Sequence, residues 1–237
     1  MLASELFKIL DRKIPPELAV AGDKIGFSGP GDPQEISVEK VGVVLDLPYK
    51  LDETLKDSDV VVCHHPPVFK PEIPVYVVHS NWDIVNGGAN DALAGCLGLE
   101  VLDIFDEKTG IGRICSASTT LKKFMKKVLN VLPTNYLGVV KAGQDEIERV
   151  AVVSGFGLNM KYMELAADWN VDLYISGDLD HRSAVLARKL GVNVLDATHH
   201  ATEIPGLEKL SELISGLGLE TEISNPGVPW EIVSSSQ

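Results

Sequence analysis

The stretch VVVCHHPPV, residues 60–68, decides the fold, because a run of β-branched residues ends there in two histidines and two prolines. An apolar run of this kind predicts a buried strand, and Pro66 and Pro67 end it with a stiff turn. The prolines also prevent His64 and His65 from diverging as neighbours on a strand do, so both imidazoles can face one cavity. Taken alone, the two histidines fit either a metal site or a hydrogen-bonded surface turn.

Length and composition indicate an acidic protein with a sizeable core. The chain has 237 residues, 45% hydrophobic residues and a formal net charge of −13, which disfavours binding to polyphosphate backbones. A basic segment at residues 121–127 has the spacing of a solvated helix face. We expect a cytoplasmic location, because the three cysteines form no CxxC pair and the chain shows neither a signal peptide nor an apolar run long enough for a bilayer.

Strands alternate with helices along the chain, and this pattern predicts an α/β fold with mixed, mostly parallel sheets. We expect a first α/β half at residues 1–112, a connector at 113–146 and a second half at 147–237, with the halves intertwined in one compact unit. Loops are expected at the Gly/Pro-rich residues 22–33 and after residue 107. A helix ending near Leu132 and a strand near residues 136–140 complete the connector.

The two halves resemble each other at their strand ends, which indicates an internal duplication. One strand ends in VVHSNWD with His79 and Asp83, and another ends in LDATHHATE with His199 and Glu203. On a helix, a spacing of four places both side chains on one face, with Cβ atoms about 5–6 Å apart. Each pair taken singly is also compatible with a helix cap or a solvated surface pair.

Every histidine lies within a few residues of a predicted strand end, and parallel sheets gather these ends at one edge, where ligands bind. We therefore expect side chains that are distant in sequence to form one metal site between the halves. Cys63 is expected to face away from His64 into the core. The candidate metal ligands are His64, His65, Asp83, His199 and Glu203.

Five segments resemble, in the same order, those of the GTP cyclohydrolase 1 type 2, or Nif-three-like, family. They read CHHPPVFKP (63–71), VVHSNWDIVNGGANDALAGCLGLE (77–100), SGFGL (154–158), SGDLDH (176–181) and DATHHATEIPGLEKL (196–210). Together they span most of the chain, and the combination is much more specific than any one motif. The resemblance implies a Nif-three-like fold with a dinuclear metal site.

The same resemblance implies that the five candidate ligands hold two divalent ions per chain, with Glu203 as the bridge. Zinc, iron, manganese and nickel all suit imidazole and carboxylate ligands. His79 and His181 resemble the family's other site histidines, for which we expect catalytic proton-transfer or supporting roles. His200 stands where the family usually has a tyrosine-like residue, so a sixth ligand stays open. The loop before Val75 is short for the family, which leaves any substrate contact of that loop open.

Two functions follow from the resemblance. The first is a metal-dependent hydrolase acting on GTP, a nucleotide or a similar small phosphorylated molecule, in which two ions activate a water molecule. The turn SGFGL either offers N–H groups to a phosphate or is simply a tight turn. The second is a non-catalytic metal-binding scaffold or a DNA-associated ring protein. The family implies a homo-oligomer, namely a ring-shaped hexamer, and we expect no membrane partner.

Overall fold

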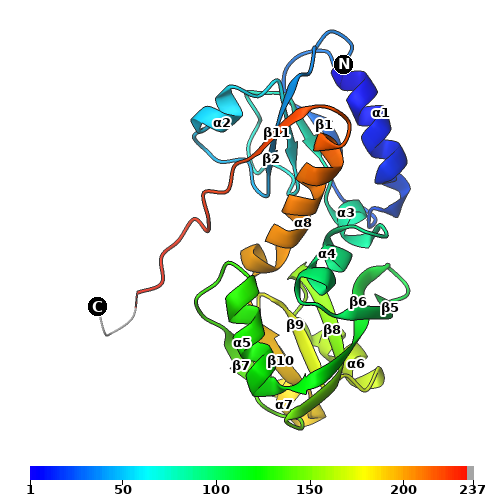
Figure 1. Cartoon of the computed structure of the whole chain (residues 1–237), viewed down its shortest axis with the longest axis vertical. Coiled ribbons are helices and arrows are strands. Elements are labelled where there is room, and N and C mark those ends of the chain that lie inside the picture. The colour runs from blue at the N-terminus through cyan, green and yellow to red at the C-terminus, as the bar shows by residue number, and fades with distance from the viewer. Residues whose placement is uncertain (234–237) are drawn as a thin grey trace.

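A computed structural model describes residues 1–233, which form two α/β units, each built around one sheet (Figure 1). The first sheet has five strands, and its parallel strands run next to one another from β4 to β11. Only β1 is antiparallel to its neighbour. In spatial order the strands are β1 (Gly26–Ser28), β4 (Val75–Val77), β3 (Val60–Cys63), β2 (Lys40–Val44) and β11 (Glu220–Ile223).

The second sheet has six strands and combines a parallel centre with antiparallel edges. Strands β8, β9 and β10 are parallel, whereas β5, β6 and β7 pair antiparallel with their neighbours. The spatial order is β5 (Glu100–Asp106), β6 (Ile111–Thr120), β8 (Glu146–Phe156), β9 (Leu173–Gly177), β10 (Asn193–Asp196) and β7 (Gly138–Val140). The predicted α/β class with mixed, mostly parallel sheets is thereby confirmed.

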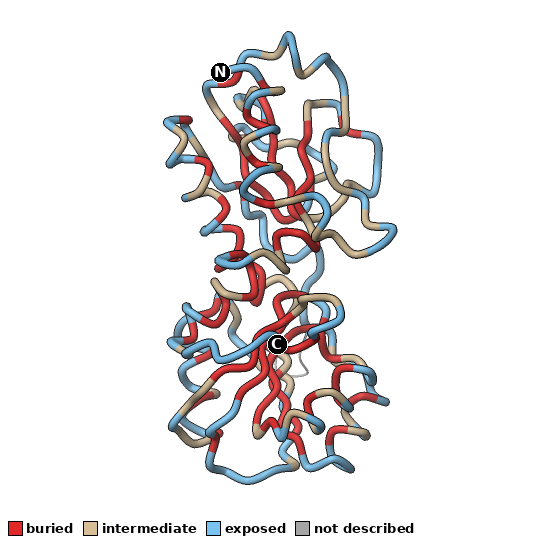
Figure 2. Tube along the Cα trace, turned by 90° about the vertical axis from the view of Figure 1, so that its right-hand side faces the viewer, coloured by how far each residue is buried: buried red, intermediate tan, exposed pale blue. Residues whose placement is uncertain are grey.

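Helices cover both faces of each sheet, so the buried residues form one layer on either side (Figure 2). Strand β3 is buried throughout, as expected for a valine run in the middle of a parallel sheet. Cys63 is fully buried in the layer opposite α1, which confirms its predicted place in the core. The helices are α1 (Ala3–Lys13), α2 (Glu53–Lys56), α3 (Ser80–Ile84), α4 (Ala89–Cys96), α5 (Leu121–Val131), α6 (Met160–Asp168), α7 (His181–Leu190) and α8 (His199–Ser215), with a 3-10 turn, η1 (Pro16–Leu18).

The sheets divide the chain at other points than the predicted halves. Strands β5 and β6 belong to the second sheet although residues 100–112 were assigned to the first half, and β11 returns to the first sheet. Residues 111–120 form a ten-residue strand where we expected a loop, because their glycine and serine residues mask the strand pattern. Strand β1 likewise lies inside the expected loop at 22–33.

Two helices connect the units and pack against each other. Helix α4 leads from the first unit to β5, and α8 leads from β10 back to β11, running in Figure 1 from the lower to the upper unit. The carboxyl ends of the parallel strands in both sheets therefore lie near the beginning of α8. No helix within residues 1–233 is both long and apolar enough to cross a membrane.

Candidate metal centre

The first unit supplies four candidate side chains from the ends of two parallel strands. His64 and His65 directly follow β3, and their backbone N–H groups donate to Val44 and Leu45, which extends the pairing with β2. The two imidazoles lie side by side, with ring centroids 4.9 Å apart. His79 follows β4, and Asp83 lies in α3, which begins directly after His79. The predicted convergence of the two adjacent histidines on one side is therefore present.

The second unit supplies His199 and Glu203 from the first turns of α8. His199 is the first helical residue, and Nε2 of its ring lies 2.9 Å from Oε1 of Glu203. Thr198 is the N-cap and accepts a hydrogen bond from the N–H of Ala201. The spacing of four residues on one helix face thus brings the imidazole and the carboxylate together.

Glu203 Oε1 joins the two units, because the Nε2 atoms of three imidazoles surround it. It lies 2.9 Å from His199, 3.2 Å from His65 and 3.5 Å from His64. The Nε2 atoms of His65 and His199 are 3.3 Å apart, and Asp83 Oδ1 is 3.7 Å from His64 Nε2. Two nitrogen ligands of one tetrahedral zinc ion, each about 2.0–2.1 Å from it, lie roughly 3.3 Å apart. These distances fit ligand atoms that share metal ions.

Three buried polar atoms at this point have no hydrogen-bond partner within residues 1–233, namely His64 Nε2, Asp83 Oδ1 and Glu203 Oε2. Buried polar atoms in native proteins nearly always have a partner, so an orphaned group of three calls for an explanation. Metal ions would satisfy all three. The chemistry and geometry of the side chains therefore fit a metal centre, and two overlapping groups of potential ligands meet there, His64, His65 and His79, and His65, His199 and Glu203.

Without a metal, the centre holds protons instead. Burial alone would lower the pKa of His65, but Asp46 and Glu203 outweigh it and raise that pKa to about 10. In the same way Glu203 and Asp178 overcome burial and raise the pKa of His199 to about 9. Burial would raise the pKa of Glu203, yet the surrounding imidazoles hold it well below its usual value. Metal binding must therefore displace protons from the histidines.

Each histidine of the cluster uses its other ring nitrogen, Nδ1, for a hydrogen bond to an oxygen atom of the chain. Three of the partners are aspartates that sequence reasoning missed. Asp23 precedes β1, Asp46 follows β2 and Asp178 follows β9, so all three lie in loops or strand ends where single aspartates carry no recognisable signal. The pairs are Asp23–His79 (2.8 Å), Asp46–His65 (3.0 Å), Asp178–His199 (2.6 Å) and Val78 O–His64 (2.9 Å).

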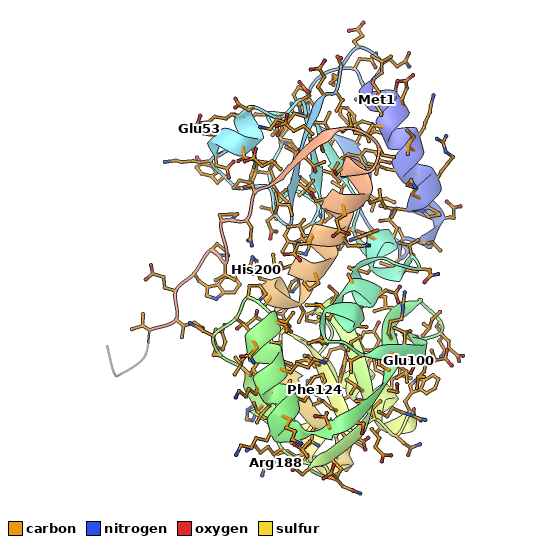
Figure 3. All side chains as sticks on the ribbon, viewed as in Figure 1. Met1, Glu53, Glu100, Phe124, Arg188 and His200 are labelled. Carbon is orange, nitrogen blue, oxygen red and sulfur yellow. The ribbon has the colours of Figure 1, made fainter. Side chains whose placement is uncertain are left out.

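Two other predicted histidines lie outside this cluster. His181 is exposed at the beginning of α7, where it lines a separate surface cavity with Met160 and Val185. His200 points toward the C-terminal segment, and its Nε2 lies 2.8 Å from Asn225 Oδ1 (Figure 3). From the segment SGDLDH, the residue that reaches the cluster is Asp178, not His181.

The turn SGFGL packs against the centre through its backbone. A Cβ atom on Gly155 would lie 2.3 Å from Glu203 Oε1, so only glycine fits there, and its φ of +72° also favours glycine. The N–H groups of Ser154, Gly155 and Leu158 donate to Asn90, Thr202 and Gly177. These donors are occupied, so of the two interpretations of SGFGL the structure favours the tight turn over a phosphate cradle.

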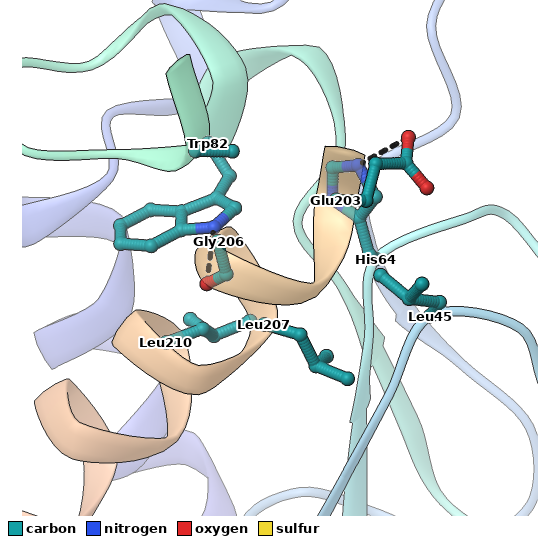
Figure 4. A pocket seen from close by; sticks show the side chains of 8 residues that line it. Leu45, His64, Trp82, Glu203, Gly206, Leu207 and Leu210 are labelled. Carbon is teal, nitrogen blue, oxygen red and sulfur yellow. Dashed lines mark hydrogen bonds and ion pairs between the residues drawn. The ribbon is translucent and has the colours of Figure 1, made fainter. Parts of the chain in front are cut away.

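Behind the centre lies a tight apolar pocket between α3, α4 and α8, with no room for a water molecule (Figure 4). His64 and Glu203 form one wall, and Leu45, Leu207 and Leu210 form much of the rest. Trp82 closes it and donates from Nε1 to Gly206 O at 3.1 Å. Apolar surroundings on this side exclude water from His64 and Glu203 and strengthen their electrostatic interactions.

A two-sheet α/β fold, with a cluster of histidines and a carboxylate between its units that could hold a metal ion, defines the class of protein, and comparison with known families identifies the family. The chain belongs to the family described as Duf34/NIF3 (NGG1p interacting factor 3), whose model matches residues 70–226. A protein named GTP cyclohydrolase 1 type 2 homolog from Methanothermobacter thermautotrophicus is 45% identical over 95% of this chain and 93% of its own length. One of the same name from Methanocaldococcus jannaschii is 32% identical over 94% and 98%. The family predicted from the sequence is confirmed.

Solved structures agree with this assignment. A structure titled "Reduced HcgD from Methanocaldococcus jannaschii" is similar with a TM-score of 0.79 and 31% identity, covering 94% of this chain and 97% of that one. A Bacillus cereus protein related to NIF3 has a TM-score of 0.86 over 98% and 99% of the two chains. At 20% identity, the latter supports the fold alone.

Proposed function

We propose that this protein is a dinuclear metal-dependent hydrolase that acts on a nucleotide or a similar small phosphorylated molecule. The observation that carries the proposal is the position of Glu203 Oε1 among three imidazole Nε2 atoms, next to buried atoms without partners. The names of the relatives, GTP cyclohydrolase 1 type 2 homolog, support a nucleotide substrate. GTP itself is the first compound to test.

In this proposal five residues would hold two divalent ions, and Glu203, whose carboxylate has two oxygen atoms, would bridge them. When bound, such ions polarise the substrate and lower the pKa of a bound water molecule. The chain orients the ligands through rigid strand ends and the first turns of α8, and Glu203 is almost fully buried. The ligands are His64, His65, Asp83, His199 and Glu203.

His79 is the proposed proton-transfer group. Its ring lies 5.2 Å from that of His64 and 5.6 Å from that of His65, centroid to centroid. Because Asp23 occupies its Nδ1, the free ring nitrogen is Nε2, which can accept or donate a proton beside the ligands. His181 lies in another surface cavity, so the proposal gives it no part in the reaction.

The test begins with metal content per chain, measured by mass spectrometry of an untagged preparation. We expect about two transition-metal ions in the unaltered protein and a loss in His199→Ala and in Glu203→Ala. Matched controls are His181→Ala and His200→Ala, which should retain the metal because neither ring reaches the cluster. A metal-loaded sample that releases no product from GTP or other nucleotides would refute the hydrolase, and absence of metal after reconstitution would refute the centre.

A non-catalytic ring protein that contacts DNA is the second candidate, and α5 is the observation that favours it. Lys122, Lys123, Lys126 and Lys127 are exposed on this helix, while its opposite face packs into the core. If these lysines bind DNA, affinity should fall steeply with salt and disappear in the Lys122→Glu and Lys126→Glu double variant. No binding in low salt would exclude this function.

The predicted hexamer is tested on the same samples by native mass spectrometry.

A further inference from the structure

Three aspartates outside the predicted ligand set each pair with one histidine of the centre. A carboxylate and a backbone carbonyl only accept hydrogen bonds, so the Nδ1 atom that contacts them must carry the hydrogen. The Nδ1 atoms of His79, His65 and His199 face Asp23, Asp46 and Asp178, and that of His64 faces Val78 O, so all four carry the hydrogen. In all four rings the nitrogen left for a metal or a proton is Nε2.

We propose that Asp23, Asp46 and Asp178 are positioning residues that fix the tautomer and the direction of His79, His65 and His199. The inference rests on the proposed metal centre and adds to it the residues that hold its imidazoles. Histidines that bind metals usually donate their second ring nitrogen to a carboxylate or carbonyl, which orients the ring and raises its basicity as a ligand. The three aspartates come from three separate segments, so the centre is held from several sides at once.

The backbone around Asp178 is adapted to the contact between its carboxylate and the His199 ring. Its backbone φ is +63°, a conformation that costs most residues free energy but that aspartate tolerates better than most. The preceding Gly177 packs so closely on α8 that a Cβ atom would lie 2.3 Å from the backbone nitrogen of His199. The end of β9 therefore presses against the beginning of α8 and places the Asp178 carboxylate 2.6 Å from the His199 ring.

Asp23 is the best anchored of the three. Its side chain is only 5% exposed and also accepts hydrogen bonds from Ser80 N, at 3.1 Å, and from Ser80 Oγ. Val20 N in turn donates to Ser80 Oγ at 3.0 Å. The Asp46 side chain is 74% exposed, so water screens its charge more than that of the buried Asp23.

The first test measures metal affinity by competition with a chelator. We expect Asp178→Ala to bind the metal about 10- to 100-fold more weakly than the unaltered protein. Asp178→Asn should recover part of this loss, because an amide oxygen still accepts the Nδ1 hydrogen. The matched control is Asp180→Asn, which changes the N-cap of α7 two residues away, where the side chain contacts Ser183 and no histidine of the centre. If Asp178→Ala binds within twofold of the unaltered protein, the inference is wrong.

The second test observes the ring hydrogens directly by NMR with labelled histidine. A hydrogen-bonded Nδ1–H gives a downfield, slowly exchanging signal, and we expect the His199 signal to disappear in Asp178→Ala and the His79 signal in Asp23→Ala. Persistence of both signals would overturn the inference.

The two proposals fail in different ways. A protein that binds no metal refutes the proposed function, whereas the ring signals can be recorded in the metal-free protein and still test the positioning role. A protein that binds two ions but keeps its affinity and ring signals in all aspartate variants refutes only the inference.

Discussion

Thr198, directly before the proposed ligand His199, has φ +70° and ψ 146°, a backbone conformation that is nearly restricted to glycine. Such a conformation costs of order 1–3 kcal/mol and is typical of functional sites. Its side chain offsets part of this cost by accepting the N–H of Ala201 at 3.2 Å. This backbone conformation directs the chain from β10 into α8, so that the His199 ring faces the other unit.

Replacing Thr198 with glycine should therefore stabilise the metal-free protein. The variant Thr198→Gly relieves the strain, whereas the lost cap costs only a few tenths of a kcal/mol, so we expect a gain of about 1 kcal/mol in the free energy of unfolding. Metal affinity should fall, because the start of α8 becomes less defined. Urea unfolding measures the first effect and chelator competition the second.

Thr120 offers the matched control, since it caps α5 with an ordinary φ of −109°. Thr120→Gly relieves no strain and should lower stability. A loss of stability in both variants would contradict the argument from strain.

The histidines of the centre predict how the stability of the metal-free protein depends on pH. Folding raises the pKa of His65 to about 10 and that of His199 to about 9, from an ordinary value near 6.5. The protonated forms are bound in the folded state, so their contribution is complete below about pH 6.5 and is lost as pH rises through 9 to 10. We expect the midpoint of thermal unfolding to fall between pH 7 and pH 10, and to fall less in His199→Ala.

Metal binding should show the opposite trend, because the ion competes with these protons. Affinity that increases from pH 6 to pH 8 in a competition assay would agree with this sign. A flat profile would show that the histidines do not release protons to bind the metal.

Among the elements, α8 has the most functions, since it carries two of the proposed ligands, His199 and Glu203, and joins the two sheets. Its Gly206 lies so close to α4 that a Cβ atom would approach Ala89 Cβ to 2.6 Å, and its carbonyl accepts from Trp82. This close crossing places the first turns of α8 beside Asp83 in the neighbouring α3. The helix also continues through Pro205, which the sequence pattern alone would favour as a helix end.

The variant Gly206→Ala should separate α8 from α4. We expect a loss of about 1–3 kcal/mol in unfolding free energy and weaker metal binding, because the extra methyl group has no space. Gly95→Ala on α4 is the matched control, since no atom lies within 4 Å of its new Cβ. That variant should gain about 0.5–1 kcal/mol from a better helix former. Equal stability of the two variants, measured by urea unfolding, would contradict the close packing.

At the scale of the whole molecule, the centre joins side chains from both units. A metal that binds only the folded protein adds about 2.7 kcal/mol of stability at a free concentration of 100 Kd. For a chain of this size we expect the unfolding midpoint to rise by roughly 5–10 °C on metal addition and to return with a chelator. Glu203→Ala should show little rise. An equal rise of the unfolding midpoint in that variant would show that the stabilising metal binds at a site that does not include Glu203.

Local signals in the sequence were sufficient for several features. The valine run before His64 predicted the central strand β3, the spacing of His199 and Glu203 predicted one helix face, and the alternation of elements predicted the α/β class. Each of these features depends on neighbours within a few residues, such as periodicity, prolines and turn residues, which the chain shows directly. The ordered motifs also identified the family.

Other features depend on contacts between distant segments, and only the tertiary structure decided them. Strands β5 and β6 belong to the second sheet and β11 to the first, and these pairings join segments that are distant in the sequence. Asp23, Asp46 and Asp178 likewise meet histidines that are 56, 19 and 21 residues away in the chain, and the residues next to each aspartate reveal nothing of that partner. A side chain in a loop finds its partner through packing across the molecule, which leaves no periodic trace in the sequence.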